Sequence, residues 1–184
     1  MCEFDANDIG LIELTENINL PYLSLIDQNT YKNILNKNGL ILGWGSTDLK
    51  NTSPDVLQQG KVIIKEFSKN VVSLNSDKFY KTYLMSFYND TGQIVNSGDS
   101  GGPLFFYQSG KYYLTGISVG GDFISDLTNY KAFYKNVYEY LPWIQKVTGI
   151  KPGQGTFAGK PPDWITPTIT PKSTLTPTPV NKGQ

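Results

Sequence analysis

The chain has 184 residues with 16 basic and 16 acidic side chains, so its formal net charge is zero. Without a basic stripe or a charged block, this balance argues against nucleic acid and against a membrane surface as partners. No apolar run approaches the ~20 residues that a membrane-spanning helix needs. The 12 tyrosines, 9 phenylalanines, 18 glycines and 11 prolines favour an all-β protein with many turns.

Short apolar runs between turn signals predict strands, at spacings typical of a barrel or sandwich. In chain order they cover residues 9–14, 40–44, 61–67, 80–87, 103–107, 112–119 and 132–137. Clusters of Gly, Asn and Asp predict turns at residues 36–39, 89–92 and 120–122.

One helix is predicted near the end, over residues 141–148. Pro142 suits a first turn, because its missing N–H would be unpaired there. Ile144 and Val147 can share one buried face, and Gly149 can take the left-handed conformation that ends a helix.

The chain divides into two parts by composition. Residues 1–150 form one predicted domain, whereas residues 151–184 are rich in Thr and Pro and cannot bury a core. The second part is predicted to be an extended, disordered tail or linker. It can be a stalk, O-glycosylated in a secreted protein, or a plain unstructured terminus.

The chain has one cysteine, Cys2, and no histidine. An internal disulfide is therefore impossible, and a zinc or copper site is not expected. A carboxylate calcium site remains open, but we expect no cofactor. Residues 1–14 are acidic and lack a charged segment before an apolar stretch, so no signal peptide is expected there.

The strongest motif is residues 98–104, GDSGGPL. A nucleophilic serine needs an exposed tight turn, backbone N–H groups that converge on a developing oxyanion, and small neighbours. Glycines on both sides of Ser100 permit such a turn and a close approach of substrate. A lone Gly-x-Ser-x-Gly is common in turns, but this longer string resembles the nucleophile loop of the chymotrypsin/trypsin family of serine peptidases.

Four further segments resemble motifs of that family in its own order, and the resemblance extends from Asp8 to about Gly149. They are residues 7–14 (NDIGLIEL), 43–45 (GWG), 114–121 (LTGISVGG) and 132–137 (AFYKNV) followed by 140–144 (YLPWI). The resemblance implies a trypsin-like antiparallel Greek-key β-barrel with a C-terminal helix, the second barrel of a two-barrel fold. Residues 9–14 would be the last strand of the first barrel.

The resemblance also implies roles for individual residues. Ser100 would be the nucleophile, and the N–H groups of Gly98 and Ser100 would form the oxyanion hole. Asp8 would orient the general-base imidazole, and Asp99 would pair with a new amino terminus created by zymogen cleavage. Taken alone, Asp8 can also be a surface turn residue and Asp99 a turn cap.

The same resemblance implies a specificity pocket. Ile94 would lie at its floor, with Val119, Gly121 and Ala132 at wall positions, and Gly120 and Gly121 would leave its entrance open. An apolar floor argues against Arg or Lys substrates, because a buried cation would lack a counter-charge. Large apolar or aromatic residues are the predicted preference, although Ile94 alone can be an ordinary core residue.

The missing histidine governs the expected activity. Without an imidazole, Ser100 keeps an ordinary, weakly nucleophilic hydroxyl, and removing such a base costs about six orders of magnitude in turnover. Nothing in the sequence places the amine of Lys111 or Lys131 beside Ser100. We therefore expect a truncated, inactive piece of an endopeptidase that is secreted by family resemblance and acts on polypeptides.

Two expectations concern partners and stability. The missing N-terminal barrel and a protein inhibitor are candidate partners, and an isolated chain should expose an apolar face and aggregate. The alternative is a pseudoprotease that binds peptides or a partner surface without catalysis. Asn96, Ser86 and Gly39 stand where the family has cysteines, so covalent ties worth a few kcal/mol each are expected to be lost.

Overall fold

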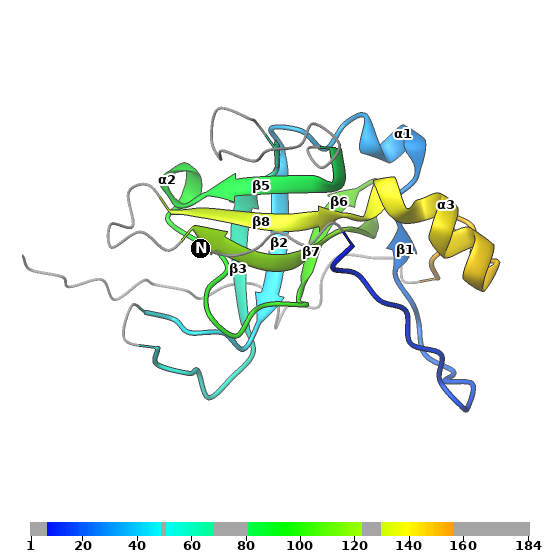
Figure 1. Cartoon of the computed structure of the whole chain (residues 1–184), viewed down its shortest axis with the longest axis horizontal. Helices are drawn as coiled ribbons and strands as arrows, with labels where there is room; N and C mark the ends of the chain where they lie inside the picture. The colour runs from blue at the N-terminus through cyan, green and yellow to red at the C-terminus, as the bar shows by residue number, and fades with distance from the viewer. Residues whose placement is uncertain (1–6, 49–50, 68–80, 123–129, 157–184) are drawn as a thin grey trace, which may run out of the picture.

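The computed structural model describes residues 7–48, 51–67, 81–122 and 130–156, and one curled sheet dominates it (Figure 1). The strands are β1 (Ser24–Leu25), β2 (Asn38–Gly43), β3 (Gln58–Ile63), β4 (Lys65–Glu66), β5 (Tyr83–Phe87), β6 (Pro103–Gln108), β7 (Lys111–Asp122) and β8 (Lys131–Asn136). The helices are α1 (Gln28–Tyr31), α2 (Tyr88–Thr91) and α3 (Val137–Thr148). The predicted all-β barrel with a C-terminal helix is confirmed.

The sheet curls because one bent stretch of chain forms both of its ends. Its strands follow the order β3-β2-β6-β7-β8-β5-β4, and only Ile64 separates β3 from β4. Ile64 is fully buried; its N–H donates to the carbonyl of Lys37 at 2.9 Å, and its carbonyl accepts from Asn36 at 2.7 Å. The non-sequential neighbours β2–β6 and β5–β8 are antiparallel, as in a Greek key.

The alternation of side chains along each strand divides the buried residues into two clusters. The main cluster fills the curl; its members include Ile26, Ile41, Val62, Ile64, Leu84, Leu104, Tyr134 and Ile144. A smaller cluster, on the other face of β5 and β8, contains Phe67, Tyr83, Met85 and Phe133. The ammonium of fully buried Lys135 lies 3.7 Å from the ring centroid of Tyr83 beside this second cluster.

Helix α3 begins four residues earlier than predicted, because Asn136 caps it directly at the end of β8. The side-chain Oδ1 of Asn136 accepts from the N–H of Tyr138 at 3.3 Å, and its side-chain Nδ2 donates to the Tyr31 hydroxyl at 2.7 Å. The rings of Tyr31 and Tyr138 stack with centroids 4.0 Å apart, which joins α1 to α3. Pro142 therefore lies inside the helix, and Gly149, with φ 72°, ends it as predicted. Among the described helices, none has both the length and the apolar character required to traverse a bilayer.

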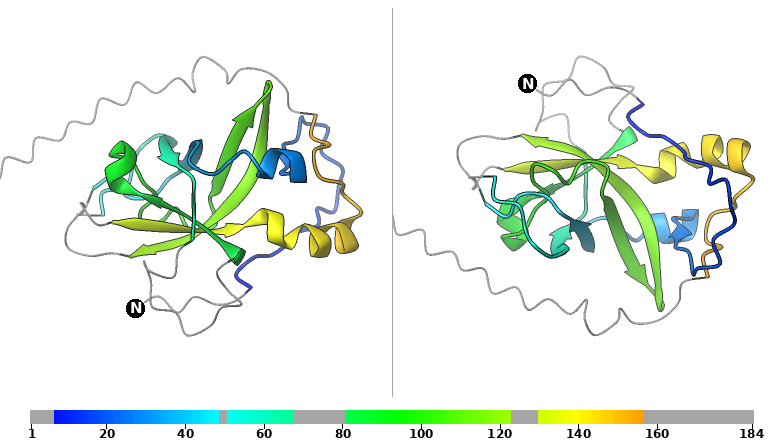
Figure 2. Two further views of the ribbon diagram at one scale, coloured as in Figure 1. Left: turned by 90° about the horizontal axis from the view of Figure 1, so that it is seen from above. Right: turned by 90° about the horizontal axis from the view of Figure 1, so that it is seen from below.

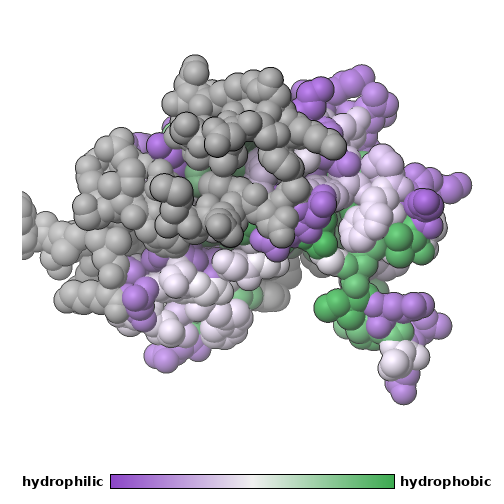
Figure 3. All heavy atoms as spheres, viewed as in Figure 1, coloured by the Kyte–Doolittle hydropathy of each residue, from purple (hydrophilic) through white to green (hydrophobic). Residues whose placement is uncertain are grey.

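The predicted strand at residues 9–14 is wrong. None of residues 7–23 belongs to a strand, and β1 begins at the following residue, Ser24. An apolar run becomes a strand only when a neighbouring strand takes its backbone hydrogen bonds, and this segment has none among the described residues. Many of its apolar side chains are exposed and gather at one side of the molecule (Figure 3); they are Leu11, Ile12, Leu14, Ile18, Leu20, Tyr22 and Leu23.

The predicted turn at residues 120–122 is also wrong, because β7 continues through it to Asp122. The pairing of β7 with β8 shifts register between Ser118 and Gly120, which is a β-bulge. Gly120 takes φ 146° there, a conformation that L residues rarely adopt. Glycine thus bends the strand instead of ending it.

Candidate active site

Ser100 lies exposed on a tight turn at residues 97–101, between the segment of Ile94 and β6. The N–H of Gly101 donates to the carbonyl of Ser118 at 2.7 Å, and the N–H of Gly102 donates to the carbonyl of Asp99 at 2.9 Å. Gly98 and Gly101 have φ of 95° and 82°. Any other residue at these two positions would strain the backbone, so the glycines around Ser100 are needed for the turn itself.

Two backbone amides beside Ser100 lack an acceptor. Within the part of the chain that the structure describes, the N–H groups of Gly98 and Ser100 donate no hydrogen bond. Amides that are held in a rigid turn and left without a protein acceptor can bind an anion or a carbonyl oxygen.

The Asp99 carboxylate anchors the turn to the segment that directly follows β2. One oxygen accepts from the N–H of Gly45 and the other from the N–H of Asn96, both at 2.8 Å. The carboxylate lies against the α-carbons of Gly43 and Gly45, where a side chain would collide with it. The sequence motif Gly-Trp-Gly is therefore a cradle for Asp99, a role that the sequence analysis missed. Pairing of Asp99 with a new amino terminus stays a prediction.

Asp8 is exposed and lies on the segment of residues 7–23. Among the described residues, no hydrogen bond or ion pair joins its side chain to the Ser100 turn. The structure thus does not bring these two residues into contact, and the catalytic role of Asp8 stays a prediction.

The predicted pocket residues fall into two groups. Gly121 and Ala132 are register partners on β7 and β8, and both are buried. Ile94 is half-buried against the main cluster, to which Ala132 belongs, whereas Val119, the bulged residue of β7, packs against the second cluster. The structure therefore groups Ile94 and Ala132 on one side of the sheet and Val119 on the other.

Tyr130 links the segment of Ile94 to Gly121. Its buried hydroxyl donates to the carbonyl of Val95 at 3.1 Å. A Cβ on Gly121 would lie 2.9 Å from this hydroxyl oxygen and 2.7 Å from the carbonyl of Lys131. Glycine at position 121 is thus required by close packing. No local sequence signal marks Tyr130, because its partner lies 35 residues away.

Two of the three positions expected to hold cysteine are now accounted for by packing. The hydroxyls of fully buried Ser86 and Tyr134 are 2.9 Å apart, and burial raises the pKa of Tyr134 above its ordinary value, partly opposed by the bond to Ser86. A Cβ on Gly39 would lie 2.8 Å from Leu104 Cδ1 and 2.9 Å from Ile64 Cγ1. A cysteine would not fit at Gly39 without moving the core.

At the third position, Asn96 ties the Ser100 turn to a loop. Its side-chain amide donates to the carbonyl of Asp48 at 3.2 Å, and its side-chain oxygen accepts from the N–H of Ser97 at 2.8 Å. Together with the bond from its own N–H to Asp99, these contacts hold the start of the turn on three sides. Hydrogen bonds thus brace the turn at a position where the family that this sequence resembles has a cysteine.

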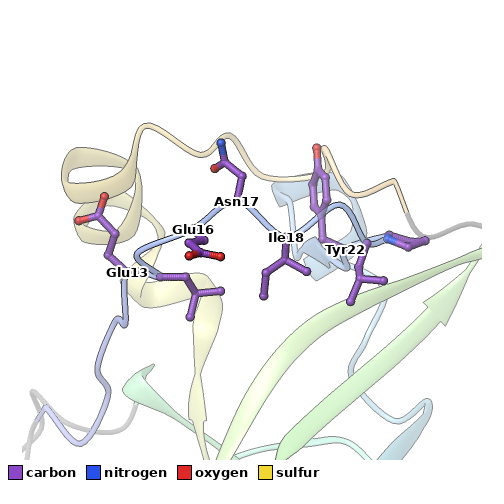
Figure 4. A pocket seen from close by; sticks show the side chains of 8 residues that line it. Glu13, Glu16, Asn17, Ile18 and Tyr22 are labelled. Carbon is purple, nitrogen blue, oxygen red and sulfur yellow. The ribbon is translucent and has the colours of Figure 1, made fainter.

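A shallow hollow lies on the segment of residues 7–23 (Figure 4). Its lining comes entirely from residues 13–22, with Glu13, Glu16, Asn17, Ile18 and Tyr22 around it. It contains none of the predicted site residues. In the described chain, no group of three His, Cys, Asp or Glu side chains is placed to hold a metal ion.

Comparisons with known proteins bear on the family of this chain. The family model described as Trypsin matches residues 2–144. The chain is 28% identical to the proclotting enzyme of Tachypleus tridentatus over 149 residues, 75% of this chain and 38% of that protein. It is 29% identical to trypsin-1 of Astacus astacus over 143 residues, 76% of this chain and 59% of that protein.

A third relative extends the same pattern. The chain is 31% identical to transmembrane protease serine 11C of Mus musculus over 157 residues, 78% of this chain and 34% of that protein. The chain therefore spans less than two thirds of the length of each of these three relatives. Because the family model covers most of the chain and the barrel has the expected strands, the chain belongs to the trypsin family of serine peptidases.

Proposed function

We propose that this chain carries the acyl-transfer part of a serine endopeptidase site. Ser100 is the nucleophile, and the N–H groups of Gly98 and Ser100 stabilise the oxyanion that forms when its hydroxyl attacks a peptide carbonyl. The observation that carries the proposal is an exposed hydroxyl on a glycine-framed turn, beside two amides without an acceptor in the described chain.

The general base is proposed to come from outside these 184 residues. The chain has no histidine, and acyl transfer needs a group that takes the serine proton and returns it to the leaving amine. Asp8 would orient that imidazole. On its own the chain would then lack about six orders of magnitude in turnover, the cost of losing the base in a related site.

The proposed substrate is a polypeptide, with a large apolar or aromatic residue in the pocket. The half-buried Ile94 packs against the main cluster, and its neighbour Val95 is buried. Neither side chain offers a counter-charge to a buried Arg or Lys. Secretion of the whole protein and recognition by a protein inhibitor are further parts of the proposal, supported only by family membership.

A non-catalytic binding module is the second candidate, and the absence of histidine favours it. In that case the Ser100 turn would bind a peptide carbonyl through its amides without cleaving the peptide. Gene sequence encoding residues upstream of Met1 separates the two candidates: an in-frame Ala-Ala-His-Cys-like stretch supports the peptidase, and its absence supports the binding module.

A labelling experiment tests the proposed chemistry at Ser100 directly. The purified chain and its Ser100→Ala variant are incubated with an organophosphonate probe, with and without free imidazole as a replacement base. We expect no labelling without imidazole, and slow labelling with imidazole that Ser100→Ala abolishes. Labelling without imidazole that depends on Ser100 would show that the chain contains its own base. Failure of imidazole to promote any labelling would refute a preformed oxyanion site.

A further inference from the structure

Residues 150–156, called here the clasp, run back from the end of α3 beside the start of β1 (Figures 1 and 2). They lie beyond residues 2–144, which the family model covers. On one side of β1, the N–H of Ile26 donates to the carbonyl of Leu114 in β7 at 3.2 Å. Because neighbouring residues of a strand point their N–H and C=O groups to opposite sides, Leu25 presents its carbonyl to the other side, where the clasp lies.

Three hydrogen bonds join the clasp to β1 and to Tyr22, which lies just before it. The N–H of Gly153 donates to the carbonyl of Leu25 at 2.9 Å. The N–H of Gly155 donates to the hydroxyl of Ser24 at 2.9 Å, and the N–H of Tyr22 donates to the Thr156 hydroxyl at 3.1 Å. The two segments are more than 125 residues apart along the chain, so only the fold brings them together.

The contact requires glycine at two clasp positions. A Cβ on Gly155 would lie 2.5 Å from the carbonyl carbon of Leu23 and 2.6 Å from the Ser24 hydroxyl. Gly153 has φ 79°, and a Cβ there would lie 2.8 Å from the carboxylate of Asp27. Backbone that approaches this closely forms a specific seat instead of a loose surface contact.

We propose that the clasp is a detachable cover for the edge of β1 and a mechanical link between the end of α3 and the segment that carries Asp8. While it is seated, it holds residues 22–27 against β7 and so sets the direction in which residues 7–21 leave the barrel. It opens separately from the barrel, because three hydrogen bonds hold it and Gln154 and Thr156 are exposed. The proposal does not depend on the chemistry at Ser100.

Amide hydrogen exchange of the full chain tests the clasp. Gly155→Val prevents the close approach, because its side chain would collide with the backbone of Leu23 and Ser24. The backbone φ of Gly155 is one that other residues can adopt. Gly10→Val is the matched control, because nothing lies within 4 Å of a Cβ at Gly10. We expect the amides of Tyr22 and Gly153 to exchange about tenfold faster in Gly155→Val, as for the loss of one or two hydrogen bonds.

The barrel provides the internal reference. Amides of β6 and β8 should exchange at the same rate in both variants, since the clasp opens without them. Equal rates at Tyr22 and Gly153 in the two variants would overturn the proposal. Equal acceleration in β6 and β8 would also overturn it, because the clasp would then not be a separate unit.

A second variant tests whether the clasp is seated even if Gly155→Val does not fold. Thr156→Val is nearly isosteric and removes only the hydroxyl that accepts from Tyr22. The Tyr22 amide should exchange about fivefold faster, equivalent to the loss of one ordinary hydrogen bond. An unchanged rate at Tyr22 in Thr156→Val would refute the seated clasp.

Discussion

Replacement of Asp99 by alanine should destabilise the chain by loosening the Ser100 turn. The substitution leaves the N–H groups of Gly45 and Asn96 without their acceptor, and it opens the cradle beside Gly43. Hydrogen bonds to a charged group contribute about 1.5–3 kcal/mol each. Because Asp99 is only half-buried, water can partly replace the carboxylate, and the lower end of that range applies.

The expected loss in the free energy of unfolding is therefore about 3 kcal/mol for the two bonds together. For a chain of this size, 1 kcal/mol corresponds to about 2–4 °C in Tm, so Asp99→Ala should melt about 6–12 °C below the unchanged chain. Asp99→Asn keeps one acceptor oxygen and the side-chain volume, so its loss should be about half as large.

The assay is thermal unfolding followed by circular dichroism, with Asp55→Ala as the control. Asp55 is exposed, and such surface substitutions change stability by about 0.5 kcal/mol or less. Amide exchange should locate the effect at Gly45 and Asn96. If Asp99→Ala melted within about 2 °C of Asp55→Ala, the anchoring role of the Asp99 carboxylate would be refuted.

Three further outcomes are expected. Burial holds the pKa of Tyr134 above its unfolded value of about 10, so its contribution to stability is complete below that pH and is lost as the pH rises further. In Tyr134→Phe, the free energy of unfolding in urea should therefore fall less steeply at alkaline pH. An unchanged slope would contradict this. Gly39→Cys should destabilise the chain by about 1–3 kcal/mol through overpacking, whereas Gly10→Ala should not, and equal urea midpoints would refute the tight contact. Ile12 is 90% exposed and belongs to the apolar segment of residues 7–23, so Ile12→Lys should reduce aggregation measured by light scattering. Unchanged aggregation would show that another surface causes it.

Most barrel strands were predictable from the sequence because each one buries one or both faces. The predicted runs at residues 40–44, 103–107 and 132–137 overlap β2, β6 and β8, since alternating or continuous apolar residues record which face is buried. The run at residues 9–14 has the same local pattern and forms no strand in the described chain. Its conformation depends on a neighbouring strand, which a local pattern does not encode.

The start of α3 was mispredicted for a related reason. Pro142 was placed in a first turn by its preference for that position, but Asn136 begins the helix earlier. Asn136 can do so because its amide also bonds the hydroxyl of Tyr31, 105 residues away. A tertiary contact thus outweighed a local preference. Of the predicted Thr/Pro-rich tail, residues 151–184, the part from residue 157 onward lies outside the described residues, whereas residues 151–156 belong to the clasp.

The sequence by itself determined the Ser100 turn, because the turn needs positive φ values that glycine readily adopts, and Gly98 and Gly101 lie within two residues of Ser100. It also determined that no histidine is present. Only the tertiary structure decided what anchors that turn and what covers β1. Asp99 finds Gly45 across 54 residues, and Gly155 finds Ser24 across 131. Such pairs share no local pattern, because they become neighbours only after the sheet has curled.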